Sequence, residues 1–354
     1  PVMRRSDDQI HPGGAAHDCR RGCRRPRAGG GGDDLWAREA NCRAFTRTDM
    51  TSPRLRVGIA GLGRMGRRHA ENLARRVPNA ELVAACSPVP DELAWAEREL
   101  GVSEGYADYA AMLAQAEVDA VFIVTPTTLH AQQIVDALRA RTHVFSEKPL
   151  SLDVAECRHV EAEAALQPDL KVMIGFVRRF DASYRHAHAR IRRGDIGRPL
   201  MVRSHTLDKN DPSGFFVRYS QASGGIFVDM SVHDIDAARW LLGTSEVARV
   251  FSAGLVGVHE GLREWSDVDN AVATCEFVTG EIATIYASRT MAHGFECMTE
   301  VIGTEGRITV GGEARLDHGG GVMNSGAPLV RVAEGFAQDV QRHHREDHEK
   351  PGKE

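Results

Sequence analysis

The sequence predicts an α/β fold in which a Rossmann-type parallel sheet is followed by an α+β domain with a mostly antiparallel sheet. Three observations support this prediction. A G-x-G-x-x-G run, Gly61 to Gly66, stands between a short apolar strand pattern and a helical pattern. Strand and helix patterns then alternate up to residue 146, as in a parallel sheet. Beyond residue 181, short strand patterns follow one another with turn residues between them, as in an antiparallel sheet.

Composition restricts the class of protein. A chain of 354 residues is long enough for two domains, and a net charge of -5 argues against a general nucleic-acid-binding surface. The sequence shows no apolar run of membrane-spanning length and no secretory signal. Its seven scattered cysteines fit reduced thiols better than a disulfide framework. We therefore expect a cytoplasmic protein that acts on a small molecule, without nucleic-acid or membrane partners.

The same features suggest domain limits. Residues 1–50 are rich in Arg, Gly and Asp and lack periodicity, so we expect a disordered extension. We expect a dinucleotide-binding domain at 51–172 and a substrate and oligomerisation domain at 173–312. Residues 313–354 form an atypical segment, nearly all charged or His at its end. No set of His and Cys has convincing zinc-like spacing, so no metal site is predicted.

The first predicted strand and helix form a phosphate-binding unit. Leu55 to Ala60 is apolar, and a helical run follows the glycines up to Ala74. The first glycine permits a tight turn, the second lets backbone approach a pyrophosphate, and the third allows close helix–strand packing. The helix start offers free N–H groups and a positive dipole to phosphates. The predicted cofactor-binding residues of this turn are Gly61, Leu62, Gly63, Arg64, Met65 and Gly66.

The second strand, Glu81 to Cys86, departs from the usual NAD pattern. An acid at its end normally binds the ribose hydroxyls, but Ser87 stands there, and Asp91 and Glu92 lie a little beyond. Serine does not repel a 2′-phosphate, yet no Arg or Lys in the adjacent loop would attract one. NAD is therefore the expected cofactor, with NADP possible, and Ser87 is a predicted contact.

The remaining elements follow from local patterns. The parallel sheet continues through strand 120–125, helix 129–139 and strand 143–146. A helix is expected at 184–193, ending near Gly194. The expected strands of the second domain are 200–206, 247–256, 271–278, 282–288, 298–302 and 307–310. Thr279-Gly280 and Thr304-Glu305-Gly306 have the composition of hairpin connections.

The stretch from Gly224 to Gly243 is where we expect the chemistry. Its apolar residues recur at helical spacing, and glycines stand at both ends. Asp229 and His233 are four residues apart, which on a helix places them on one face. A carboxylate beside an imidazole is the pairing that a general base needs. An isolated Asp-x-x-x-His is more often part of a solvated helix face. The catalytic interpretation of this pair therefore depends on the other motifs of the chain.

Several motifs together resemble a known family. Thr125-Pro126-Thr127-Thr128-Leu129-His130 and Glu147-Lys148-Pro149 resemble motifs of the glucose-fructose oxidoreductase and inositol dehydrogenase family (Gfo/Idh/MocA). The runs from Gly175 to Asp181 and from Gly224 to His233 resemble its inositol 2-dehydrogenase branch. The resemblance extends from about Arg56 to Val310. It implies a cis bond before Pro149, a bond that is tolerable because X-Pro has only a small trans preference.

The resemblance also implies the site. Its catalytic set would be Lys148, Asp229 and His233, with Arg178 and, more weakly, His205 as further polyol contacts. The motif residues that it adds to the cofactor site are Thr125, Pro126, His130, Glu147 and Lys148. From the residues themselves, Lys148 follows a strand at the carboxyl edge of the sheet, where ligands of such folds bind.

The function that follows is NAD(P)-dependent oxidation of a secondary hydroxyl of a cyclic polyol, foremost myo-inositol to 2-keto-inositol. A dehydrogenase of another cyclic sugar and a non-catalytic sugar- or nucleotide-sensing regulator are the alternatives. The family also implies a homotetramer or other homo-oligomer.

Overall fold

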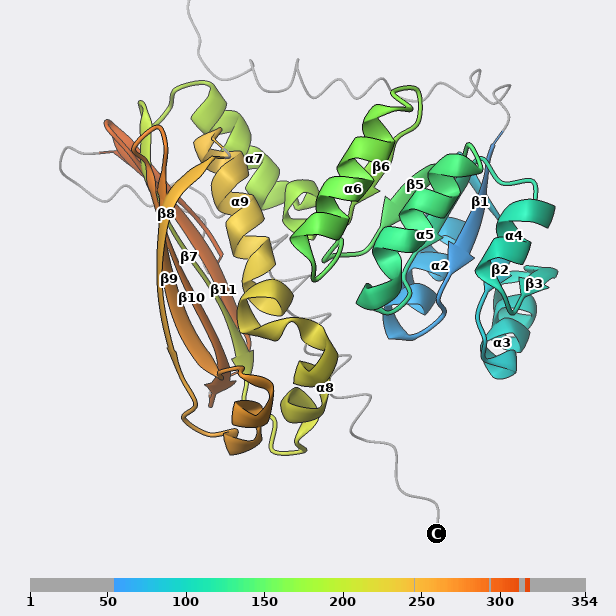
Figure 1. The fold of residues 1–354 in the computed structure, drawn as a ribbon. Coiled ribbons are helices and arrows are strands. Elements are labelled where there is room, and N and C mark those ends of the chain that lie inside the picture. The colour runs from blue at the N-terminus through green and yellow to red at the C-terminus, as the bar shows by residue number, and fades with distance from the viewer. Residues whose placement is uncertain (1–53, 245, 293, 312–315, 319–354) are drawn as a thin grey trace, which may run out of the picture. The chain divides into compact units, whose positions relative to one another are not determined.

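The computed structural model describes residues 54–311, except 245 and 293, and the backbone of 316–318 (Figure 1). The expectations for residues 1–50 and for most of 313–354 lie outside the described residues. Both predicted sheets lie within the described part and are present.

The first sheet is parallel throughout, as predicted. Its strand order is β3-β2-β1-β4-β5-β6, that of a doubly wound dinucleotide-binding fold. Strand β1 begins and ends at the predicted residues, Leu55–Ala60. Its other strands are β2 (Ala80–Cys86), β3 (Glu104–Tyr106), β4 (Ala120–Ile123), β5 (His143–Ser146) and β6 (Val172–Ile174).

Helices connect these parallel strands. They are α2 (Arg64–Arg76), α3 (Pro90–Leu100), α4 (Tyr109–Gln115), α5 (Thr127–Arg139) and α6 (Val154–Ala165). Asp108 and Asp153 cap α4 and α6 by accepting hydrogen bonds from backbone N–H groups of the first turn. The core between sheet and helices is built from small and branched residues such as Ile59, Val121 and Ile134, none of which is exposed.

The second sheet is mixed. Its order is β13-β12-β11-β7-β10-β9-β8, and every neighbouring pair is antiparallel except β7 with β10. The hairpins predicted at Thr279-Gly280 and Thr304-Glu305-Gly306 are confirmed. The strands are β7 (Pro199–Lys209), β8 (Val247–Leu255), β9 (Asn270–Phe277), β10 (Ile282–Met291), β11 (Glu296–Gly303), β12 (Gly306–Val310) and β13 (Leu316–His318).

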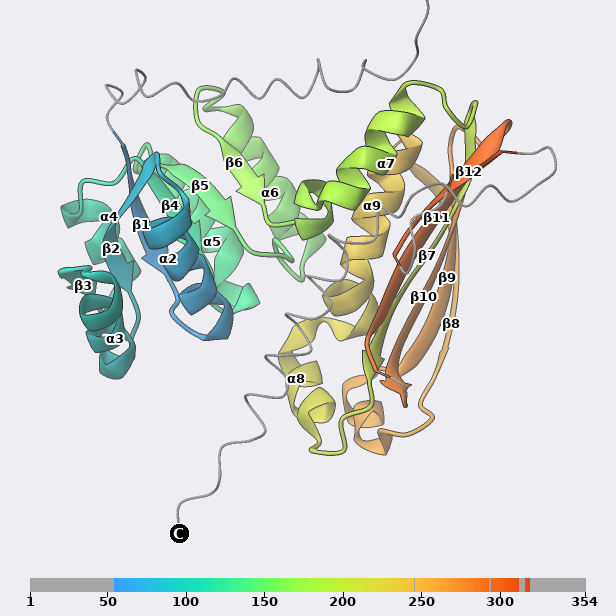
Figure 2. The ribbon, with the colours of Figure 1, turned by 180° about the vertical axis from the view of Figure 1, so that it is seen from behind.

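Two helices cover one face of this sheet. In both views α7 (Ala182–Arg192) and α9 (Val232–Leu242) lie along the same side of it (Figures 1 and 2). Ala237 and Leu241 of α9 pack with Val202 of β7 and Ala283 of β10 in one buried cluster. Short 3₁₀ turns span Val177–Phe180 and Glu260–Trp265, and the second of them contacts α8 (Phe215–Ser223).

The segment expected to carry the chemistry is not one uniform helix. Helix α8 (Phe215–Ser223) ends at Gly224, and Gly224 and Gly225 both have positive φ, of 76° and 85°. A π-helical turn then spans Phe227–Ser231 and continues into α9, which ends at Gly243 with φ 75°. Glycine suits these three left-handed positions because it has no Cβ. Among the described residues, no helix is both long and apolar enough to cross a membrane.

Candidate active site

The glycine turn has the geometry of a phosphate cradle. Gly61 has a φ of 89°, and its N–H donates to the carbonyl of Cys86 at the end of β2. A Cβ on Gly66 would stand 2.0 Å from the carbonyl oxygen of Gly61, so only glycine allows this packing. A Cβ on Gly63 would meet nothing within 4 Å. The turn is therefore tightly packed at Gly66 and open at Gly63, where the pyrophosphate of a dinucleotide approaches the backbone.

The loops after β4 and β5 are joined by His130. Its ring is buried, and its two nitrogens lie 2.8 Å from the carbonyl oxygens of Thr125 and Pro149. The hydroxyl of Thr125 donates to Gln133 of α5, and Pro126 stands at the start of that helix. His130 thus holds the two loops of the predicted cofactor site against each other rather than pointing out of them.

Glu147 connects Lys148 to the helix of the glycine turn. One carboxylate oxygen lies 2.8 Å from Nε2 of His69 on α2, and the other accepts the backbone N–H of Lys148 at 3.1 Å. Burial raises the pKa of Glu147, but His69 and Lys148 outweigh that effect and hold it below its ordinary value. The Lys148–Pro149 bond is cis, which confirms the expectation drawn from the resemblance.

Lys148 and Asp229 lie together. The Lys148 ammonium donates to the backbone carbonyl of Asp229 at 2.6 Å and lies 3.6 Å from its carboxylate. Each side chain is 19% exposed, so the pair is accessible but largely shielded. The hydroxyl of Tyr219, on α8, approaches the same carboxylate at 3.4 Å. Lys148, two residues beyond β5, thus contacts Asp229 of the π-helical turn.

Asp229 has a second cationic partner that the sequence did not reveal. Arg289 of β10 is fully buried and lies between two carboxylates, 3.3 Å from Asp229 and 2.8 Å from Asp267. Asp267 also accepts hydrogen bonds from the backbone N–H of Ile226 and the hydroxyl of Ser220. Burial raises the pKa of Asp267, but Arg289 and the backbone N–H groups outweigh that effect and lower it.

His233 lies one turn beyond Asp229, but no hydrogen bond joins the two among the described residues, and His233 Nδ1 is buried without a partner. The predicted carboxylate–imidazole pair is therefore not formed here. Asp229 lies in the π-helical turn and His233 in the first turn of α9, and the carboxylate of Asp229 is directed to Lys148, Tyr219 and Arg289 instead. Burial and the positive charges of Lys148 and Arg178 lower the pKa of His233 to about 3. Its imidazole is neutral at ordinary pH.

Arg178 lies beneath the site in a buried polar cluster. Its guanidinium donates to Asp234 at 2.6 Å and to Thr206 at 2.6 Å, and Ser204 donates to the same Asp234 carboxylate at 2.5 Å. Asp234 is fully buried and follows His233 in the chain. The terminal nitrogens of Arg178 are thus bonded to protein groups. Arg178 affects the site through its positive charge near His233 and its hydrogen bond to Asp234 of α9.

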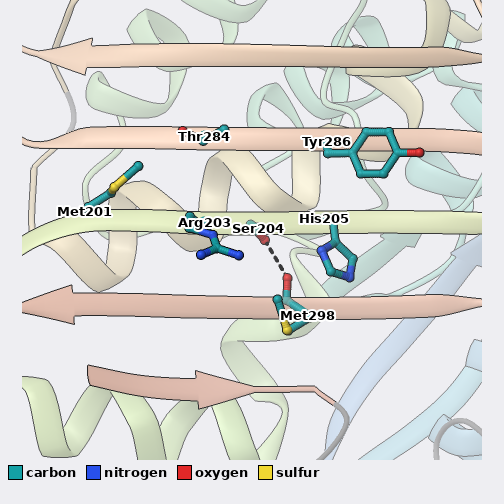
Figure 3. Close-up of a pocket in the computed structure, with 7 residues that line it drawn as sticks. All are labelled: Met201, Arg203, Ser204, His205, Thr284, Tyr286 and Met298. Carbon is teal, nitrogen blue, oxygen red and sulfur yellow. Dashed lines mark hydrogen bonds between the residues drawn. The ribbon is translucent and has the colours of Figure 1, made fainter. Parts of the chain in front are cut away.

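The structure does not bring His205 together with the other predicted residues. Ser204 and Thr206 face α9, and since side chains alternate along a strand, His205 faces the opposite side of the sheet. There it contacts Glu296 at 2.9 Å. It lines a hollow in the sheet with Arg203, Tyr286 and Met298, and Figure 3 shows these side chains on three neighbouring strands.

The arrangement can hold a hydroxylated substrate and remove a proton from it. A cation, a carboxylate and a neutral imidazole lie near the carboxyl edge of the sheet, where ligands of such folds bind. No group of three or more His, Cys, Asp or Glu in the described part could hold a metal ion.

Two family models match the chain. The oxidoreductase family model of GFO_IDH_MocA, an NAD-binding Rossmann fold, matches residues 55–176. The GFO/IDH/MocA C-terminal domain model matches residues 184–309. Together they span most of the described residues.

Named relatives and solved structures agree with these models. A scyllo-inositol 2-dehydrogenase (NAD(+)) of Bacillus subtilis is 38% identical over 73% of this chain and 74% of its own. A myo-inositol 2-dehydrogenase of Thermotoga maritima is 37% identical over 72% and 74%. The crystal structure of scyllo-inositol dehydrogenase from Lactobacillus casei with bound NAD(H) and scyllo-inositol is 38% identical, with a TM-score of 0.70 over 83% of this chain and 89% of that one.

Proposed function

We propose the activity of this chain from one premise: it belongs to the GFO/IDH/MocA oxidoreductase family and carries that family's NAD-binding Rossmann domain. The proposed reaction is oxidation of a secondary hydroxyl of an inositol ring to a ketone, with myo-inositol as the first substrate to test. The observation that carries it is the meeting of Lys148 with Asp229, one turn before a neutral His233.

Each residue has a role that its surroundings support. His233 presents an uncharged imidazole, so it can accept the proton of the hydroxyl. The Lys148 ammonium can hold the same oxygen and stabilise the negative charge that develops on it. Asp229, with one oxygen toward Arg289 and the other toward Lys148 and Tyr219, is placed to accept a hydrogen bond from a neighbouring ring hydroxyl. NAD, when bound, accepts the hydride of the carbinol carbon.

The substrate class rests on the relatives and on the polar character of the site. The relatives named above carry the names of scyllo- and myo-inositol dehydrogenases. These two isomers differ in configuration at one carbon only, so oxidation at that carbon yields one and the same ketone. A site with a cation, a carboxylate and an imidazole suits a ring that carries hydroxyls on every carbon.

The test is NADH formation by the purified chain with myo-inositol, scyllo-inositol and a panel of cyclic sugars. We expect turnover with at least one inositol, and little with pyranoses such as glucose. The control is His233→Ala, which should bind NADH but turn over far more slowly. Preferred turnover of a pyranose would support the alternative of another cyclic sugar. Binding of NAD without turnover of any polyol would contradict the proposed reaction.

A homo-oligomer is also proposed. The face of the second sheet away from α9 exposes large apolar side chains, among them Phe251 at 70% and Leu255 at 59%. Val272 and Ile282 lie exposed on neighbouring strands. Apolar patches of this kind are rare on monomers and mark interfaces. Light scattering should give a mass of two or more chains, and Phe251→Glu should lower it; a monomeric wild type would contradict this proposal.

A further inference from the structure

The end of β2 carries a carboxylate that comes from another element. Ser87, the first residue after β2, is 1% exposed, and its hydroxyl donates to the carboxylate of Glu92 at 2.5 Å. The same hydroxyl oxygen accepts the backbone N–H of Val89 at 3.1 Å. Since serine has one O–H, its donor is already used on Glu92. Ser87 therefore acts as a support for Glu92 rather than as a ribose contact of its own.

This carboxylate lies beside the cofactor turn. The carbonyl of Cys86, the residue before Ser87, accepts the N–H of Gly61 at 2.9 Å. The end of β2 is thus joined directly to the glycine turn. In NAD-binding folds an acid at this strand end accepts the ribose hydroxyls. In this chain Ser87 occupies that position. Glu92, in the first turn of α3, places its carboxylate within hydrogen-bond distance of the Ser87 hydroxyl.

The helix supports a negative charge here. Glu92 is half-buried in the first turn of α3, where the helix dipole favours a carboxylate. Its neighbour Asp91 is exposed, and no hydrogen bond of the described residues engages the Asp91 side chain. The two acids therefore differ: Glu92 is fixed by Ser87, and Asp91 extends toward solvent.

A cation of the helix that follows the glycine turn contacts α3, the helix of Glu92. Arg67 of α2 lies over the ring of Trp95, one turn beyond Glu92, at 4.9 Å from the ring centre. Its Nε donates to the carbonyl of Leu62 in the glycine turn at 3.2 Å. Arg67 is thus already engaged with the turn and the indole. A 2′-phosphate at the ribose would face the carboxylate of Glu92 unless Arg67 left both partners.

We propose that Glu92, positioned by Ser87, is the residue that selects NAD over NADP in this chain. Its carboxylate accepts hydrogen bonds from the ribose hydroxyls and repels a 2′-phosphate through charge in a partly shielded place. The sequence alone suggested weak discrimination, because Ser87 occupies the position of the acid. In the structure Glu92, five residues beyond Ser87, supplies a carboxylate at this position.

The test is direct binding of NADH and NADPH, measured by the change in nucleotide fluorescence without any polyol. We expect wild type to bind NADH at least about tenfold more tightly, equivalent to about 1.4 kcal/mol. Glu92→Gln keeps the shape and removes the charge, so it should raise NADPH affinity about tenfold and change NADH affinity much less. Ser87→Ala should move the ratio in the same direction by a smaller factor, because Glu92 loses its support.

Asp91→Asn is the matched control, since it removes an equal charge one residue away and should leave the ratio unchanged. Thermal unfolding of each variant checks that the fold is intact. Equal binding of the two dinucleotides by wild type, or an unchanged ratio in Glu92→Gln, would overturn the inference. An equal shift in Asp91→Asn would also overturn it, because the effect would then be general charge. Since no substrate is present, these results stand apart from those of the polyol assay.

Discussion

The guanidinium of Arg289, fully buried on β10, lies 3.3 Å from the carboxylate of Asp229 and is joined at 2.8 Å to Asp267. With Lys148 these groups form a row of alternating charge that runs from the Rossmann sheet into the second sheet. Arg289 is the most deeply buried member of this row, and its removal would leave Asp267 buried without a cation.

The first prediction follows from that row. Arg289→Met leaves the buried Asp267 without its cation and Asp229 with Lys148 alone, so the free energy of unfolding should fall by about 3–5 kcal/mol. Denaturant unfolding measures this. Arg139→Met is the control, because its pair with Glu163 on the helical surface is half-exposed and worth less than about 1 kcal/mol. Equal losses in the two variants would show that burial of the Arg289 pairs has no special cost.

The second prediction concerns proton transfer. His233→Ala should lower turnover by about 10²–10⁴-fold, the usual scale for a lost general base. NADH binding should persist, since His233 lies in α9 and not in the glycine turn. His159→Ala, at an exposed position of α6, is the control and should leave turnover unchanged. Full activity of His233→Ala would remove this residue from the proposed reaction.

The sequence predicted the nucleotide fold well because its signals are local. The glycine turn depends on residues within six positions, and β1 begins and ends where the apolar run does. Lys148 was found through the resemblance, since a lysine after a strand is otherwise unremarkable. Its contact with Asp229, 81 residues away, depends on how the two sheets pack.

Three features depended on the tertiary fold and could not be predicted. Arg289 alternates in β10 like any polar strand residue, so only the packed sheet shows that it faces inward. The prediction that His205 contacts the substrate was wrong because the sequence does not tell which face of a strand meets α9, and His205 lies on the other face. The π-helical turn that carries Asp229 has no clear sequence signal.

The third prediction is a pH dependence of stability. The pKa of His233 is about 3 in the folded chain and near its ordinary 6.5 when unfolded. As pH falls below 6.5, the unfolded state takes up the proton first, so the contribution of His233 is full above pH 6.5 and is lost toward pH 3. Each pH unit in that window should cost about 1.4 kcal/mol. Unfolding of wild type and His233→Ala between pH 7 and pH 4 measures the difference, and parallel curves would contradict the lowered pKa.

The last prediction separates the two roles of the glycine turn. Gly63 has a φ of -65° and open space where a Cβ would stand, so Gly63→Val should fold normally. The valine would occupy the place where backbone must approach the pyrophosphate, so NADH affinity should fall by at least about tenfold. Gly66→Ala is the counterpart, because its Cβ would lie 2.0 Å from the carbonyl oxygen of Gly61 and must displace backbone. It should lower thermal stability as well as NADH binding. Fluorescence titration and thermal unfolding of both variants distinguish the roles, and tight NADH binding by Gly63→Val would show that the turn does not hold the dinucleotide.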